Sequence, residues 1–145
     1  MIRVVLDVNV LVSATPSPTG TPGYLVEAWL QKQYTLVVSE TMLDRLAVAW
    51  QKPYFLSRMS EQQRRRAFEL LRDRATLVEP APDVRGVADD LEDDLVLATA
   101  VAGNASHLVT GDCGLLERDG YRGLILLTPA AFRLVLESPA AGESR

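Results

Sequence analysis

Cysteine and histidine are almost absent from this chain of 145 residues, which contains one of each. A single cysteine cannot form an internal disulfide, and one His with one Cys cannot supply the four nitrogen and sulfur ligands of the usual structural zinc site. Thiol catalysis is disfavoured as well, because six residues of expected strand and turn separate Cys113 from His107. Any metal would have to be held mainly by oxygen.

Long apolar runs, repeats and low-complexity segments are also lacking. No uncharged apolar run approaches the roughly 18 residues that a membrane-spanning helix needs, and the start of the chain lacks a signal-peptide pattern. We therefore expect a cytoplasmic protein with no membrane segment. Scattered Gly and Pro with 48% apolar residues predict a single globular domain over residues 1–137 and a flexible tail over 138–145.

An excess of positive charge is missing too, since the formal net charge is −4. The molecule as a whole is not expected to attract nucleic acid or an anionic membrane surface. The 19 Asp and Glu residues make it important whether the acids are spread over the surface or gathered at one place.

Short aliphatic runs alternate with segments of helical periodicity. We expect strands at residues 2–6, 35–38, 75–78, 106–110 and 123–127. Expected helices cover residues 24–31, 40–51, 61–74, 90–103 and 129–137, with a capping box of Ser60 and Gln63 at the start of the third, a short helical turn after Asp112 and loops at 13–23 and 79–84. This alternation predicts an α/β fold with a parallel sheet that is covered on both faces.

Two acids follow expected strands directly. Asp7 comes after the first strand, and Asp112 comes two residues after Thr110, which ends the fourth. Asn9 would share a side of an extended chain with Asp7 and could orient its carboxylate. Parallel sheets bind ligands beyond the carboxyl ends of their strands, so this edge is the expected site.

Three further acids lie on helices that begin near the same edge. Asp93 and Asp94 fall in the first turn of the helix before the fourth strand, and Asp44 lies one turn into the helix after the second. Carboxylates that converge repel one another unless a cation lies between them. An oxygen-only set suits Mg²⁺ or Mn²⁺, which can activate water for phosphodiester cleavage. Helix capping and helix-dipole roles remain the alternatives for Asp93, Asp94 and Asp112.

Three segments together resemble the PIN-domain family, and most of all the VapC-like toxins of bacterial toxin-antitoxin pairs. They are VVLDVNVLVSA at 4–14, EDDLVLA at 92–98 and LVTGDCGLL at 108–116. The resemblance implies a three-layer α/β/α sandwich with a central parallel sheet, Mg²⁺- or Mn²⁺-dependent cleavage of single-stranded RNA, a small antitoxin partner and a homodimer. The family's acids match Asp7, Asp94 and Asp112, with Asp93 as a neighbour that could share the role and Asn9 and Thr110 as polar support.

One position departs from the family pattern. Six residues after Ser39, where the family usually has Glu, this chain has Arg45, and Asp44 is adjacent. Either a small rotation of the helix brings Asp44 into the site, or Arg45 points into the crevice and could bind an RNA phosphate. We expect Asp44 to enter, because a divalent cation attracts a carboxylate and repels a guanidinium.

Two other functions compete with ribonuclease activity. The stronger is a PIN fold with a weakened site that binds an antitoxin or RNA without efficient cleavage. A phosphotransferase of the haloacid-dehalogenase type is less compatible, because its second acid would be Asn9 here and the only lysines are Lys32 and Lys52.

Overall fold

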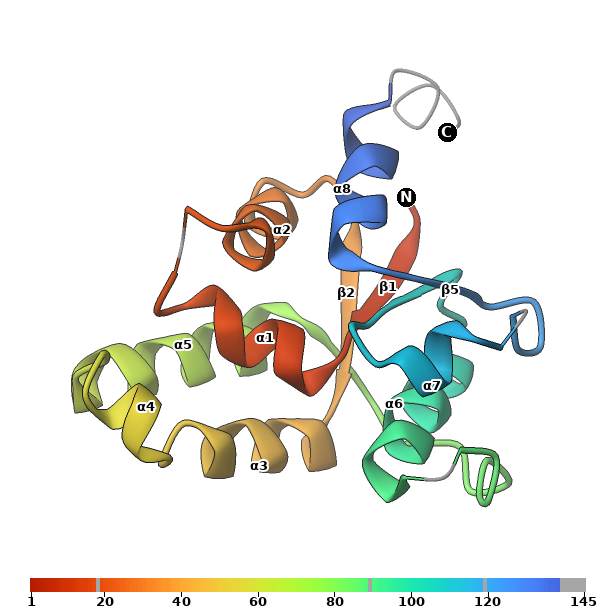
Figure 1. The fold of residues 1–145 in the computed structure, drawn as a ribbon, viewed down its shortest axis with the longest axis horizontal. Coiled ribbons are helices and arrows are strands. Elements are labelled where there is room, and N and C mark those ends of the chain that lie inside the picture. Colours follow the sequence, from red (N-terminus) through yellow and green to blue (C-terminus); the bar gives the residue numbers. More distant parts are fainter. Residues whose placement is uncertain (18, 89, 119, 139–145) are drawn as a thin grey trace.

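The computed structural model describes residues 1–17, 19–88, 90–118 and 120–138. The strands are β1 (Arg3–Leu6), β2 (Thr35–Ser39), β3 (Thr76–Val78), β4 (His107–Val109) and β5 (Ile125–Leu127). The helices are α1 (Val8–Ala14), α2 (Thr21–Leu30), α3 (Glu40–Ala49), α4 (Pro53–Leu56), α5 (Glu61–Arg74), α6 (Leu91–Ala102), α7 (Cys113–Leu116) and α8 (Pro129–Glu137). Figure 1 shows their arrangement.

The five strands form one parallel sheet in the order β3-β2-β1-β4-β5. Val4 at the centre is paired with Leu36 of β2 on one side and with His107 of β4 on the other. The chain runs outward from β1 through β2 to β3, then crosses back to β4 and continues to β5. The direction of strand succession therefore reverses between β1 and β4, which is where such sheets bind ligands.

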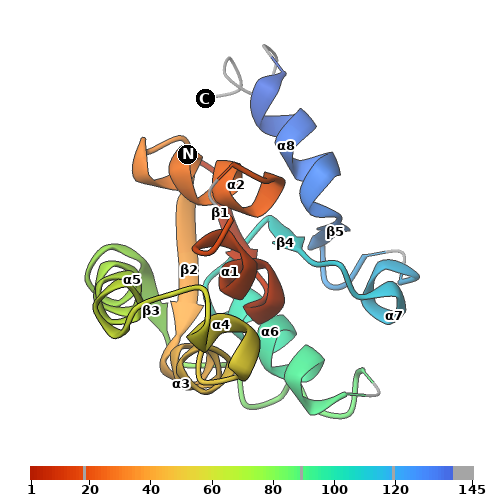
Figure 2. The same ribbon diagram turned by 60° about the vertical axis from the view of Figure 1, so that its left-hand side comes forward.

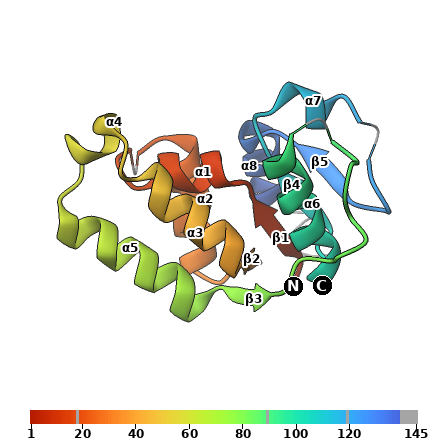
Figure 3. The same cartoon turned by 90° about the horizontal axis from the view of Figure 1, so that it is seen from below.

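Helices flank both faces of this sheet. Right-handed crossovers place the helices that lead from β1 to β3 on one face and those that lead from β3 to β5 on the other. Helix α6 packs against β1, β2 and β4, while α1 packs against α2 and α3, and α8 against α2 (Figure 2). Seen from below, β1 lies between the α3–α5 group and the α6–α7 group (Figure 3). The predicted α/β sandwich with a central parallel sheet is confirmed.

The core is aliphatic and includes both tryptophans. The central strands are buried on both faces, as expected when helices cover a parallel sheet. Trp50 is 2% exposed, and its indole Nε1 donates to the carbonyl oxygen of Val12 at 3.3 Å. Trp29 is buried as well. Both rings stabilise the packing of helices and are not available for stacking on bases.

The main error of the sequence-based prediction concerns residues 8–23. Val8–Ala14 was expected to begin as extended chain and continue as a loop, but it forms α1. The Asp7 carboxylate accepts the N–H of Val10 at 3.0 Å and so begins a helix directly after β1. Helix α2 also begins earlier than expected, at Thr21, with Pro22 in its first turn.

Two smaller differences concern other segments. The helix expected over residues 40–51 ends at Ala49, before Pro53, and Pro53 begins a short helix, α4, that was not expected. Residues 139–145, most of the expected C-terminal tail, lie outside the described residues. Within the part of the chain that the structure describes, no helix has the length and hydropathy of a membrane span.

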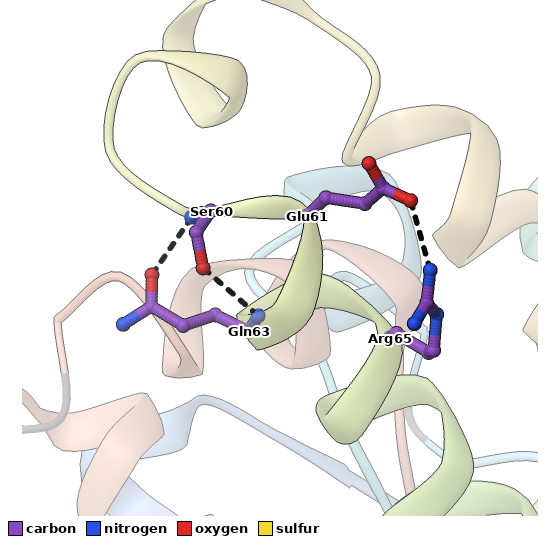
Figure 4. A network of polar contacts seen from close by, with 4 residues as sticks. All are labelled: Ser60, Glu61, Gln63 and Arg65. Carbon is purple, nitrogen blue, oxygen red and sulfur yellow. Dashed lines mark hydrogen bonds and ion pairs between the residues drawn. The ribbon is translucent and has the colours of Figure 1, made fainter.

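The predicted capping box at the start of α5 is confirmed. Ser60 Oγ accepts the N–H of Gln63 at 3.1 Å, and the Gln63 side chain accepts the N–H of Ser60 at 2.8 Å (Figure 4). We expect Ser60→Ala to lower the free energy of unfolding by about 1 kcal/mol, measured by urea denaturation. Arg65→Ala is the matched control, because it removes only the exposed Glu61–Arg65 pair and should cost under about 0.5 kcal/mol. Equal losses for the two variants would contradict this assignment.

Candidate functional site

Asp7 lies at the carboxyl end of β1 and is 7% exposed. Burial raises the pKa of this carboxyl group above its ordinary value. Hydrogen bonds from Thr110 and from the backbone oppose that rise, and the charge of Asp112 adds to it. Capping α1 uses one of its oxygens, and the other accepts a hydrogen bond from Thr110, the residue that follows β4.

Thr110 joins the ends of β1 and β4 across the point where strand succession reverses. Its side chain is fully buried, and Oγ1 donates to Asp7 Oδ2. The same oxygen accepts the N–H of Asp112 at 3.0 Å. One hydroxyl therefore links the two acids that follow the central strands.

Asp112 is exposed and caps α7, because its Oδ2 accepts the N–H of Leu115 at 2.8 Å. Asp93, in the first turn of α6, comes close to it. Partial burial, the charges of Asp112, Asp90 and Asp7, and a hydrogen bond with Asp112 raise the pKa of Asp93 to about 6. The charges of Asp7, Asp93 and Asp112 therefore affect one another, and we call these three residues the acid cluster.

Asp94 points elsewhere, although it is adjacent to Asp93. Its carboxylate is 6% exposed and accepts three backbone N–H groups, from Gly86 at 2.8 Å, Val87 at 3.1 Å and Ala88 at 2.7 Å. These hydrogen bonds hold the pKa of Asp94 below its ordinary value. The structure thus brings Asp93 into the acid cluster, whereas Asp94 binds the loop that precedes α6.

The remaining expected residues are not brought to the acid cluster. Helix α3 buries Met42, Leu43 and Leu46, which leaves Asp44 and Arg45 exposed. Glu40 raises the pKa of the Arg72 guanidinium on α5 through a hydrogen bond and its charge, and the charge of Asp44 adds a smaller contribution. The expected rotation of the helix toward the site is not seen, because it would expose this apolar face.

Asn9 is exposed within α1, so it does not lie beside Asp7 on an extended chain. His107 and Cys113 do not form a pair either. The imidazole Nδ1 of His107 is 2.7 Å from Ser106 Oγ, and Cys113 is exposed at the start of α7. Cys113 and His107 therefore do not form a thiol–imidazole pair.

The donor set of the acid cluster is chemically suited to a hard divalent cation. Its donors are carboxylate oxygens. The raised pKa values of Asp7 and Asp93 mean that their ionised forms are disfavoured, and a nearby cation would stabilise those forms. Among the described residues, however, no three His, Cys, Asp or Glu side chains already converge on one point. The reason is that Asp7 and Asp112 cap helices, so an ion would have to draw these carboxylates further together.

Arg118 is the functional candidate that sequence reasoning missed. It follows α7, and its guanidinium donates to the carbonyl oxygen of Val87 in the loop that Asp94 holds. No local sequence motif indicates this contact, because Arg118 and Val87 are 31 positions apart.

Comparison with known proteins identifies the fold. Residues 3–114 match the family model described as PIN domain. A structure of VapBC2 from Rickettsia felis bound to a DNA fragment from their promoter has a TM-score of 0.58 and 22% identity, covering 86% of this chain and 97% of that chain. A structure of FitAcB from Neisseria gonorrhoeae has a TM-score of 0.51 and 15% identity, covering 88% of this chain and 98% of that chain. No curated protein sequence matches.

At these identities the two structures support the fold alone. The family model, in contrast, extends from the start of β1 into the first turn of α7 and so includes every member of the acid cluster. The match agrees with the resemblance carried by the three sequence segments around Asp7, Asp93 and Asp112. This chain belongs to the PIN domain family.

Proposed function

We propose that this chain is a Mg²⁺- or Mn²⁺-dependent endoribonuclease that cleaves single-stranded RNA and acts as the toxin of a toxin-antitoxin pair. The observation that carries the proposal is the acid cluster, in which Asp7, Asp93 and Asp112 gather from three segments where strand succession reverses. Membership of the PIN family supports the nuclease class.

Each residue of the site has a separate role in this proposal. Asp7, Asp93 and Asp112 hold the ion, and Thr110 keeps the Asp7 carboxylate in place through its hydroxyl group. When bound, the ion polarises the phosphodiester and lowers the pKa of the attacking water. Asp94 supports the site from the loop side. Asp44, which was expected to be catalytic, has no role in this proposal, because its charge lies near Arg72.

The proposed partners are an RNA substrate, a small antitoxin protein and a second copy of the chain in a cytoplasmic homodimer. Support for the antitoxin comes from the resemblance to VapC-like toxins and from the two similar folds, which are those of VapBC2 and FitAcB. Size-exclusion chromatography with light scattering would test the homodimer.

The test of the enzymatic proposal uses the purified chain and an end-labelled single-stranded RNA. Cleavage should require Mg²⁺ or Mn²⁺, stop in EDTA and return when the ion is added in excess. A double-stranded RNA of the same sequence is the substrate control. Cleavage that persists in EDTA would reject the metal-dependent mechanism, and expression without growth arrest in a bacterial host would speak against the toxin role.

A weakened PIN-fold binding module is the second candidate, and one observation favours it. The position at which the family resemblance places a Glu is the exposed Arg45, and Asp44 does not compensate for the missing acid. Titration calorimetry with Mn²⁺ separates the two functions. A folded chain that binds no ion and cleaves no RNA would support the binding module.

Metal binding should also stabilise the fold in a pH-dependent way. The pKa of Asp93 is raised from 3.8 to about 6, so protonation of this carboxylate favours the folded state. That stabilisation is fully present below about pH 4 and is lost as pH rises through 6. We therefore expect EDTA-treated protein to lose stability from this group between about pH 4 and 6, and saturating Mg²⁺ to restore it.

The measurement is the difference in melting temperature between the wild type and Asp93→Asn across this pH range. Taking the difference removes the opposite contribution of His107, whose pKa is lowered by burial and which destabilises the fold as pH falls. A difference that does not change with pH would show that Asp93 does not share charge with Asp7 and Asp112.

A further inference from the structure

The loop between β3 and α6 is fastened on both sides by buried or half-buried polar contacts. On one side the Asp94 carboxylate accepts the N–H groups of Gly86, Val87 and Ala88. On the other side the carbonyl oxygen of Val87 accepts a hydrogen bond from the Arg118 guanidinium. We call this set, Asp94, residues 86–88 and Arg118, the clasp.

The clasp connects the two segments that carry the exposed part of the acid cluster. Asp94 is adjacent to Asp93 in the first turn of α6. Arg118 comes two residues after the end of α7, and Asp112 caps the beginning of that helix. The backbone N–H of Arg118 also donates to the carbonyl oxygen of Leu115, so Arg118 is tied to the last turn of α7.

A connection of this kind is needed because the segments carry like charges. Asp93 and Asp112 repel each other when both are ionised, and that repulsion contributes to the raised pKa of Asp93. Helix α7 has only four residues and packs against the edge strand β5. A tether from the Val87 carbonyl to Arg118 opposes the movement of α7 away from α6.

We propose that the clasp sets the spacing of Asp93 and Asp112, which makes Arg118 a positioning residue for the metal site although it touches neither acid. This inference rests on the proposed function, because the spacing matters for an ion held by the acid cluster. Arg118 acts through the loop backbone, and Asp94 completes the same path from α6.

The first experiment measures Mn²⁺ affinity by titration calorimetry on the full chain without RNA. Arg118→Met keeps the length of the side chain and removes the hydrogen bond, and we expect about tenfold weaker binding. Arg118→Lys retains a donor for the Val87 carbonyl and should recover most of the affinity. Wild-type affinity in Arg118→Met would overturn the proposal.

Arg122→Met is the matched control. Arg122 belongs to the same connection between α7 and β5 and contacts the same loop through Asp83 at 3.0 Å. That pair is exposed and lies outside the clasp, so its loss should change Mn²⁺ affinity less than twofold. Equal weakening by both variants would show that general loosening of the loop, and not the clasp, controls binding.

The second experiment is hydrogen exchange in EDTA, which does not depend on metal binding. In Arg118→Met we expect faster exchange at the amides of Gly86, Val87 and Ala88, and also at the Leu115 amide bound to Asp112. Faster exchange at Leu115 together with a wild type that binds no Mn²⁺ would reject the proposed function while leaving the tether in place. Unchanged exchange at Leu115 would overturn the tether itself.

Discussion

Asp7→Asn should reduce RNA cleavage by roughly 100-fold or more, the rate equivalent of about 3 kcal/mol, because it removes a buried negative charge that would hold the ion. The amide oxygen can still accept the N–H of Val10, so the cap of α1 is retained. Loss of a buried charge also removes its desolvation cost. The variant should therefore remain folded.

The measurement is the initial rate of single-stranded RNA cleavage in Mg²⁺ and in Mn²⁺, with thermal unfolding as the folding check. Asp73→Asn is the control. Asp73 is an exposed acid on α5, and its substitution changes the net charge by the same amount as Asp7→Asn. A wild-type rate in Asp7→Asn would mean that the buried acid serves only to cap α1, and the site assignment would have to be abandoned.

The adjacent acids Asp93 and Asp94 should respond in opposite ways to the same substitution. Asp94→Asn replaces one acceptor oxygen with an NH₂ group that faces a backbone N–H of the loop. We expect the free energy of unfolding to fall by about 2 to 3 kcal/mol, measured in urea with EDTA present. Asp93→Asn removes a repelled charge, so stability without metal should be unchanged or higher.

Mn²⁺ affinity completes this comparison. Asp93→Asn should weaken binding by tenfold or more, because a ligand to the ion is lost. A tenfold change in Kd corresponds to about 1.4 kcal/mol. Asp94→Asn, compared at a temperature where it is fully folded, should lose less affinity. The reverse order would return Asp94 to the role that the family resemblance implied for it.

Local sequence signals predicted much of the fold and led to the candidate site. The alternation of strands and helices indicated a parallel sheet, and the acids after two strands indicated its carboxyl edge. Both signals are short-range sequence patterns. The capping box of Ser60 and Gln63 is another pattern of this kind. The cap by Asp7 is equally local, but the β-branched residues after it favoured an extended reading.

The choice between neighbouring acids could not be made from sequence. Asp93 and Asp94 point about 100° apart on a helix, and what distinguishes them is a loop that folds back six to eight residues away. The position of Asp44 depends on which face of α3 is buried against the rest of the fold. Contacts of this kind are set by tertiary packing, which no short segment encodes.

The pairing of β1 with β4 has a consequence during synthesis of the chain. The hydroxyl contact between Thr110 and Asp7 spans 103 positions, so the acid cluster forms only after the segment that carries Thr110 and Asp112 has left the ribosome. Contacts of such long range are also late in folding, because a large loop must close before they form. A chain that ends before Asp112 would lack a member of the acid cluster, so under the proposed function it would not cleave RNA.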